Sequence, residues 1–201
     1  MHPRLLSEYK KILKGLNIKG SILEVGANPD YKKSLLSLKE LDNATEKIGL
    51  NLDGPYTFKD FSIVKGNSNS MKMFNDQKFD LVLCNAVSEH DKFFWKTISE
   101  INRVLKKGGL VIYGAPGFKR YNLEKLQSAI HLIPIIKKLG RTKYFNFLFA
   151  TSITHKVHDA PGDYYRFSPA CFKEVFLEGY EDKKVWEVMA PPRIIGIGKK
   201  I

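Results

Sequence analysis

The chain is poor in cysteine and has no long apolar run, and both scarcities restrict what the protein can be. Its 201 residues include two cysteines, Cys84 and Cys171, too few and too far apart for a disulfide framework. We therefore expect a reducing, cytoplasmic environment. No stretch approaches the roughly 18 consecutive apolar residues of a membrane span, so we expect none. The first residues mix charged and apolar side chains, unlike a secretory signal.

Acidic residues are outnumbered by basic ones, 21 against 33, which gives a net charge of +12. Such a surplus suits nucleic acid, an anionic membrane surface or an acidic substrate. The basic residues are spread along the chain, however, and no basic-aromatic ladder typical of an RNA-binding motif is present. We therefore expect a lysine-rich solvated surface and a small-molecule partner, which the charge allows to be anionic, rather than nucleic acid.

Apolar periodicity predicts alternating helices and strands. A helix is expected over residues 4–16, because apolar residues recur there at helical spacing. Further helices are expected near 31–41 and 93–105. The predicted strands are 21–25, 47–52, 61–64, 79–84 and 110–115. This alternation favours a mostly parallel sheet covered on both faces, in one domain over 1–201.

The segment 118–158 interrupts this alternation. It contains an apolar and basic stretch with Pro134 in its middle, which should end or kink a helix, and a run of aromatic residues follows. We interpret it as a helical and aromatic insertion near the active site, although a pair of packing helices fits equally well. Its aromatic part could serve as a substrate lid or as the face of a homodimer. A helix over 169–177 and a terminal antiparallel strand pair are expected after it.

Polar residues follow the predicted strands, where ligands bind in open α/β sheets. After the first strand come Glu24, Gly26, Asn28 and Asp30, and the glycine permits close approach of the backbone to a ligand. A phosphate beside Glu24 and Asp30 would be repelled, whereas a cationic group would not. The turn therefore argues against a nicotinamide dinucleotide, whose phosphate-binding glycine spacing is also missing.

Histidines beside carboxylates are the candidates for proton transfer. His90 follows the fourth strand and lies between Glu89 and Asp91, and neighbouring acids stabilise a protonated imidazole. His155 and His158 precede a second polar group, Asp163, Tyr164, Tyr165 and Arg166. With Glu89, His90 or Asp91, these histidines have the residue types of a divalent metal site, but nothing in the spacing demands one, and we predict no metal.

The most informative stretch is Phe79 to Gly117. It holds Phe79-Asp80, Asn85, Glu89-His90, the helix end Arg103-Val104-Leu105-Lys106 and the turn Gly108-Gly109, in that order. In this it resembles the class I S-adenosylmethionine-dependent methyltransferase family. The resemblance implies a Rossmann-like fold with a seven-stranded, mostly parallel sheet whose last strand is antiparallel, and S-adenosylmethionine as cofactor.

The resemblance also implies roles for the strand-end residues. Glu24 and Gly26 match the acid and first glycine of the family's turn, while Asn28 and Asp30 replace its later glycines. The ribose position falls on Asn51 or on Asp53, and the two remain alternatives. The implied neighbours of the adenine ring and of the rest of the cofactor are Asn67 and Asn85.

The resemblance implies methyl transfer to an oxygen atom of a small acceptor, and related proteins point to sugars or surface polysaccharides as the acceptor class. Such a reaction requires a base, for which His90, His155 and His158 are the candidates. The acceptor would contact Glu89 and the segment Asp163 to Arg166. Two alternatives remain: a non-catalytic partner-binding protein, because Asn28, Asp30 and Asn51 are departures, and a nucleic-acid methyltransferase. Against the nucleic-acid alternative, this chain lacks an Asn/Asp-Pro-Pro-aromatic tetrapeptide after the fourth strand.

Overall fold

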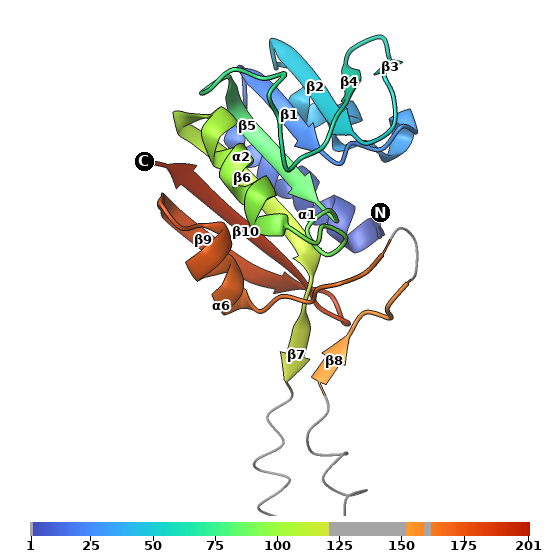
Figure 1. Cartoon of the computed structure of the whole chain (residues 1–201), viewed down its shortest axis with the longest axis vertical. Coiled ribbons are helices and arrows are strands. Elements are labelled where there is room, and N and C mark those ends of the chain that lie inside the picture. The colour runs from blue at the N-terminus through green and yellow to red at the C-terminus, as the bar shows by residue number, and fades with distance from the viewer. Residues whose placement is uncertain (1, 121–151, 159–161) are drawn as a thin grey trace, which may run out of the picture.

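An eight-stranded mixed sheet organises the molecule (Figure 1). The structure is a computed structural model that describes residues 2–120, 152–158 and 162–201. The strand order is β3-β4-β2-β1-β5-β6-β10-β9. The strands of this sheet are β1 (Ser21–Val25), β2 (Glu46–Asn51), β3 (Tyr56–Thr57), β4 (Ser62–Lys65), β5 (Phe79–Asn85), β6 (Leu105–Pro116), β9 (Tyr180–Val188) and β10 (Arg193–Lys200).

The pairing of the strands confirms the expected fold. Strands β4, β2, β1, β5 and β6 pair in parallel, and β10 runs antiparallel to both β6 and β9. The eighth strand beyond the seven expected is the two-residue β3, which pairs antiparallel with β4 at the edge. Buried parallel strands are rich in apolar residues, and this is why the predicted strand positions lie close to the observed ones. The main difference is β6, which begins at Leu105 rather than at Leu110.

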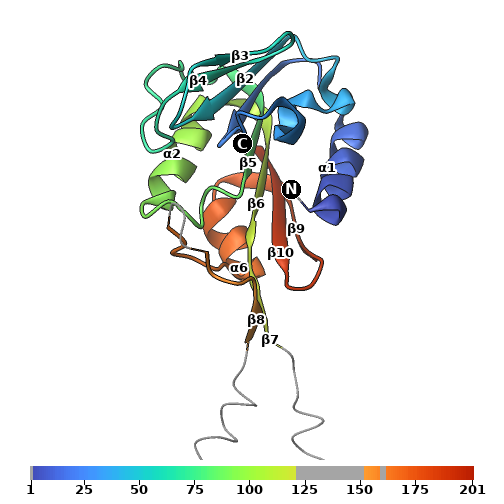
Figure 2. The ribbon, with the colours of Figure 1, turned by 90° about the vertical axis from the view of Figure 1, so that its right-hand side faces the viewer.

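Two helices cover opposite faces of the sheet (Figure 2). Helix α1 (Pro3–Leu16) buries Leu5, Tyr9 and Leu13 against one face. Helix α2 (Phe94–Val104) buries Ile101 and Val104 against the other. Each helix thus places an apolar stripe on the sheet. Among the residues described, no helix is long and apolar enough to cross a membrane.

The expected helix over 31–41 is wrong. Three short 3-10 turns occupy the segment, at Tyr31–Lys33, Leu35–Ser37 and Lys39–Leu41. The chain is extended between them, with ψ of 141° at Ser34 and 132° at Leu38. The buried Glu24 carboxylate accepts hydrogen bonds from the Ser34 hydroxyl and from the amides of Leu35 and Leu36. Those bonds replace the partners that a continuous helix would have supplied.

The chain leaves the sheet after β6 as a two-stranded antiparallel ribbon of β7 (Phe118–Arg120) and β8 (Ser152–Thr154) (Figure 1). The described ends of the predicted insertion are therefore strands, and its helical and aromatic part, 121–151, lies outside the described residues. The expected helix after Ser168 is confirmed as α6 (Pro169–Cys171), which continues as a π-helical turn over Phe172–Phe176. The Ser168 hydroxyl accepts a hydrogen bond from the Cys171 amide and so caps its start.

Candidate active site

The turn after β1 is shaped by Gly26. This residue has φ of 77°, and its amide and that of Ala27 both donate to the Leu50 carbonyl, at 2.8 and 3.0 Å. A Cβ on Gly26 would lie 2.3 Å from Cγ2 of Val87, in the loop after β5. Glycine is therefore required both by the left-handed backbone and by the close approach of the two strand ends.

Glu24 is turned inward beneath this turn. Its buried carboxylate holds the backbone of 34–36, and burial raises its pKa while the hydrogen bonds from Ser34, Leu35 and Leu36 oppose that rise. Glu24, which was predicted to contact the cofactor, therefore stabilises the backbone that follows the turn. Its three hydrogen bonds all come from residues 34–36.

The end of β2 is tied to the same turn. The Asn51 side chain donates to the Ala27 carbonyl at 2.7 Å, and its oxygen accepts from the Asp53 amide at 2.9 Å. The Asp53 side chain is exposed, and Leu52 beside it exposes 64% of its surface. The amide oxygens of Asn28 and Asn67 each accept from the backbone amide two residues ahead, at 2.9 Å, in Asx turns.

Two side-chain oxygens at this edge lack partners. The parallel register places Asn85 just beyond the Val25–Cys84 pair, beside the Gly26 turn. Its Oδ1 is buried without a hydrogen-bond partner among the described residues, and so is the hydroxyl of Tyr9 from α1. Both atoms fill the space that a side chain at Gly114 would need, at 2.5 and 2.4 Å from where its Cβ would lie. Burial raises the pKa of Tyr9, so the phenol stays protonated and able to donate.

The loop after β5 carries a buried ion pair. Glu89 is buried, and its Oε1 accepts from Arg193, the first residue of β10, at 3.3 Å, while its Oε2 has no partner among the described residues. Burial raises the pKa of Glu89, and the Arg193 guanidinium opposes the rise. Neither Tyr9 nor Arg193 is recognisable in the sequence as a site residue, because Tyr9 is part of the apolar stripe of a helix and Arg193 begins the last strand.

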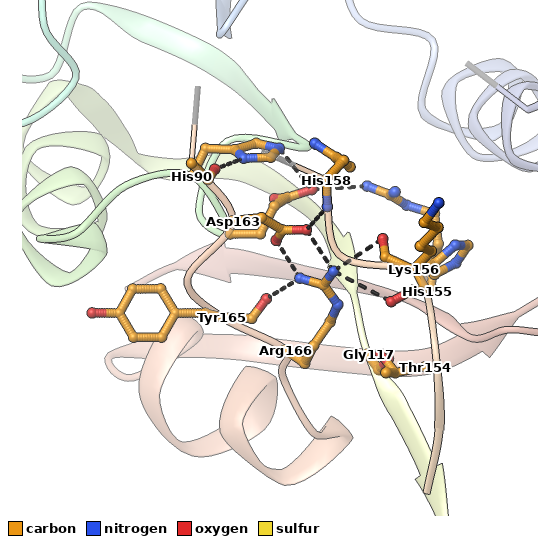
Figure 3. Close-up of polar contacts among 12 residues, drawn as sticks. His90, Gly117, Thr154, His155, Lys156, His158, Asp163, Tyr165 and Arg166 are labelled. Atoms are coloured by element: carbon orange, nitrogen blue, oxygen red, sulfur yellow. Dashed lines mark hydrogen bonds and ion pairs between the residues drawn. The ribbon is translucent and has the colours of Figure 1, made fainter. Parts of the chain in front are cut away.

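His90 and His158 are brought together (Figure 3). Their ring centroids are 4.8 Å apart, and Nδ1 of His90 contacts the Gly162 carbonyl. A carbonyl can only accept, so Nδ1 carries the proton and Nε2, which is 4.0 Å from Oε1 of Glu89, is left as the acceptor in the neutral ring. Within the described ranges, no three His, Cys, Asp or Glu side chains gather as metal ligands would.

The predicted substrate residues Asp163 and Arg166 pair with each other. Both carboxylate oxygens accept from the Arg166 guanidinium, which also donates to the carbonyl of Tyr165 at 2.8 Å and to those of His155 and Lys156 at 3.4 Å (Figure 3). The guanidinium lowers the pKa of Asp163 far below its usual range. The pair therefore ties the segment before α6 to the segment after β8 that carries His155, and it is buried on the Asp163 side.

The two tyrosines of this segment face different ways. The Tyr164 amide donates to the Glu89 carbonyl at 2.7 Å, while its ring is 47% exposed. The Tyr165 hydroxyl donates to the Lys92 carbonyl at 3.0 Å, so both residues attach their segment to the loop after β5.

His155 differs from the other two histidines. Its Nε2 is buried and has no hydrogen-bond partner among the described residues. Burial lowers the pKa of His155, and the charges of Arg193 and Arg166 lower it further. The ring is therefore neutral at pH 7 and holds an unused nitrogen.

Comparison with known proteins supports a methyltransferase fold. The sequence model of the family described as "Methyltransferase domain" matches residues 30–113. The chain resembles the class I S-adenosylmethionine-dependent methyltransferases in sequence and in fold. No curated protein matches the chain.

Two solved structures illustrate the shared fold. The 1,6-didemethyltoxoflavin-N1-methyltransferase of Burkholderia thailandensis, bound to 1,6-didemethyltoxoflavin and S-adenosylhomocysteine, aligns with a TM-score of 0.63 and 13% identity over 97% of this chain and 77% of its own. The N-methyltransferase NodS of Bradyrhizobium japonicum, with S-adenosylhomocysteine, aligns with 0.60 and 8% over 98% and 85%. These complexes indicate S-adenosylmethionine as the cofactor in this methyltransferase family.

Proposed function

We propose that the chain transfers a methyl group from S-adenosylmethionine to an oxygen atom of a small-molecule acceptor. The observation that carries this proposal is the grouping of the Gly26 turn with Asn85 and Tyr9, whose side-chain oxygens have no partner among the described residues. The charge of Arg193 acts on both Tyr9 and His155 and so connects His155 to this group. A turn open to close approach suits the cofactor, and an unused imidazole nitrogen suits a proton acceptor.

The residues at this edge fit S-adenosylmethionine in charge and in polarity. Glu24 and Glu89 are the carboxylates whose charges act on Tyr9 at this edge, and they favour a sulfonium and an ammonium over a phosphate. The exposed Leu52 offers an apolar surface for a purine ring. Of the two ribose candidates, Asp53 has an exposed side chain, whereas both ends of the Asn51 amide are engaged with backbone. When bound, the cofactor would supply an electrophilic methyl group.

His155 is the residue that we assign as the proton acceptor. An acceptor hydroxyl must lose its proton as its oxygen attacks the methyl carbon, and a neutral, buried imidazole nitrogen can take that proton. The Asp163–Arg166 pair would act on this step by positioning, because Arg166 binds the His155 carbonyl. His90 would line the same site from the opposite loop, through its contact with Gly162.

A second candidate is a methyltransferase-fold protein that binds a partner and no cofactor. It is favoured by the internal engagement of Asn28 and Asn51, whose side chains contact backbone groups of the turns after β1 and β2. The two functions differ in one property, because only the enzyme binds S-adenosylmethionine.

The test of methyl transfer uses S-adenosylmethionine with an isotopically labelled methyl group. The purified protein is incubated with small hydroxylated acceptors, including acidic sugars, and the labelled product is identified by mass spectrometry. Label on an acceptor oxygen is the expected result. Label on nitrogen would contradict the assignment of oxygen, and the absence of transfer to any small-molecule fraction would favour the partner-binding function.

A further inference from the structure

A group of exposed aromatic rings and lysines borders the candidate active site. Phe93, Trp95 and Tyr164 expose 47%, 50% and 47% of their surface, which is high for such large apolar side chains. Two lysines flank them. We call this surface the aromatic-lysine rim, and its members are Lys92, Phe93, Trp95, Lys96 and Tyr164.

The rim is a continuous surface anchored from below. Ring contacts connect its two segments, from Phe93 to Trp95 at 5.7 Å, and then through the partly buried Phe94 and Tyr165 to Tyr164 at 6.3 Å. Phe94 in turn packs on core phenylalanines. The rings near the start of α2 and that of Tyr164 are therefore held in place, rather than free to fold back onto the protein.

Lysine ammonium groups lie over two of the three exposed aromatic rings. Nζ of Lys96 lies 4.9 Å from the Phe93 ring centroid, and Nζ of Lys92 lies 5.4 Å from that of Tyr164. A base or a sugar binds such rings by stacking on their faces. With an ammonium group over each of these rings, that mode is hindered, whereas the ring edges stay exposed.

The charge that the rim presents outward is positive. Its nearest carboxylate in the sequence is Asp91, whose oxygens accept from Asn69, from Thr97 and from the Phe93 amide. This carboxylate is thereby bonded to neighbouring groups of the protein. A second copy of the same cationic rim would be repelled, and an anionic surface would be attracted, in keeping with the net charge of +12.

We propose that the aromatic-lysine rim binds the surface of an anionic lipid bilayer. Exposed aromatic rings with polar groups beside them suit the headgroup region of a bilayer, and the lysines next to them reach the lipid phosphates. The Tyr164 amide binds the Glu89 carbonyl, so the rim is contiguous with the candidate site and would hold that site near the bilayer surface. This binding does not depend on methyl transfer.

Vesicle flotation tests the proposal with matched charge variants. The full chain is mixed with phosphatidylcholine vesicles, with or without phosphatidylglycerol. We expect binding only to the anionic vesicles, and the double variant Phe93→Ala/Trp95→Ala should weaken it by roughly tenfold. Lys92→Ala/Lys96→Ala should weaken it more than Lys183→Ala/Lys184→Ala, which removes the same charge from exposed positions on β9. Equal loss in both lysine pairs would overturn the proposal.

Tryptophan fluorescence locates the contact, because the chain has two tryptophans. The variant Trp186→Phe leaves Trp95 as the reporter, and its emission should shift to the blue and be quenched by brominated anionic lipid. The variant Trp95→Phe leaves Trp186, which is partly buried and hydrogen-bonded to Glu8, and it should show neither change. No response of Trp95, or rim-dependent binding to oligonucleotides that matches binding to vesicles, would contradict a lipid surface as the partner.

Discussion

The Tyr9 hydroxyl of α1 and the Asn85 amide oxygen at the end of β5 both lie in the space that a side chain at Gly114 would need, and neither has a hydrogen-bond partner among the described residues. Buried polar atoms without partners are uncommon and costly. The pair offers one donor and one acceptor beside the Gly26 turn. A ligand that supplies the matching groups would satisfy both atoms, and so we expect α1 to contribute to cofactor binding.

Replacing Tyr9 with Phe tests this role. Loss of one hydrogen bond should weaken S-adenosylhomocysteine binding by about 1 kcal/mol, measured by calorimetry. The free energy of unfolding should stay the same or rise, because the lost hydroxyl has no partner in the free protein. Tyr113→Phe is the matched control, since Tyr113 is equally buried but belongs to the core on the other face of the sheet. Reduced stability with unchanged affinity would assign Tyr9 to the core alone.

Replacing Gly26 with Ala should lower stability and cofactor affinity together. The added Cβ would collide with Val87 and must also adopt a left-handed conformation, which by itself costs roughly 1–2 kcal/mol. Gly108→Ala separates the two effects, because Gly108 has φ of 73° but open space around its side-chain position. Urea denaturation should show the larger loss for Gly26→Ala, and equal losses would mean that the contact with Val87 is unimportant.

The Asp163–Arg166 pair predicts a pH dependence of stability. Arg166 lowers the pKa of Asp163 in the folded state, so the pair stabilises the fold above the unfolded carboxyl pKa of about 3.9. That contribution is lost as the pH falls toward the lower folded pKa. Asp163→Asn should therefore be less stable than the parent protein at pH 7 and show a weaker loss of stability on acidification.

The control for this pair is Glu181→Gln, which breaks the exposed ion pair with Lys199 and should change the stability little, because solvent screens such a pair. Denaturation at several pH values provides the measurement. If Asp163→Asn and Glu181→Gln behave alike, the Asp163–Arg166 pair does not hold the histidine loop in place.

Replacing His155 with Ala should abolish methyl transfer while leaving S-adenosylhomocysteine binding intact. Because the pKa of His155 is lowered, the parent enzyme should keep its activity below the ordinary histidine pKa of about 6.5. Activity should decline only once the pH reaches the lowered value and the ring becomes protonated. His90→Ala is the comparison, and a larger loss there than in His155→Ala would transfer the role of base to His90.

Much of the sheet was predictable because its buried parallel strands are rich in apolar residues, as β5 is over residues 81–84. The expected helix over 31–41 failed for a tertiary reason, since the Glu24 carboxylate captures backbone amides about ten residues away. Local periodicity carries no information about such a contact.

The candidate site was predictable where its residues follow strands directly, as Gly26, Asn85 and Glu89 do. Tyr9 and Arg193 could not be recognised, because their positions depend on α1 and β10 packing across the sheet. A polar residue within an apolar stripe was the one available signal for Tyr9. The pairing of Asp163 with Arg166 was readable as an i, i+3 ion pair, but its contact with the histidine loop was not.

Calorimetric titration with S-adenosylmethionine and S-adenosylhomocysteine, with NAD as the control, tests the central claim most directly. The Gly26 turn, the exposed Leu52 and the unpartnered oxygens of Tyr9 and Asn85 predict micromolar binding of the first two ligands and none of NAD. Absence of binding by both would contradict the enzymatic function and leave the partner-binding protein as the better account.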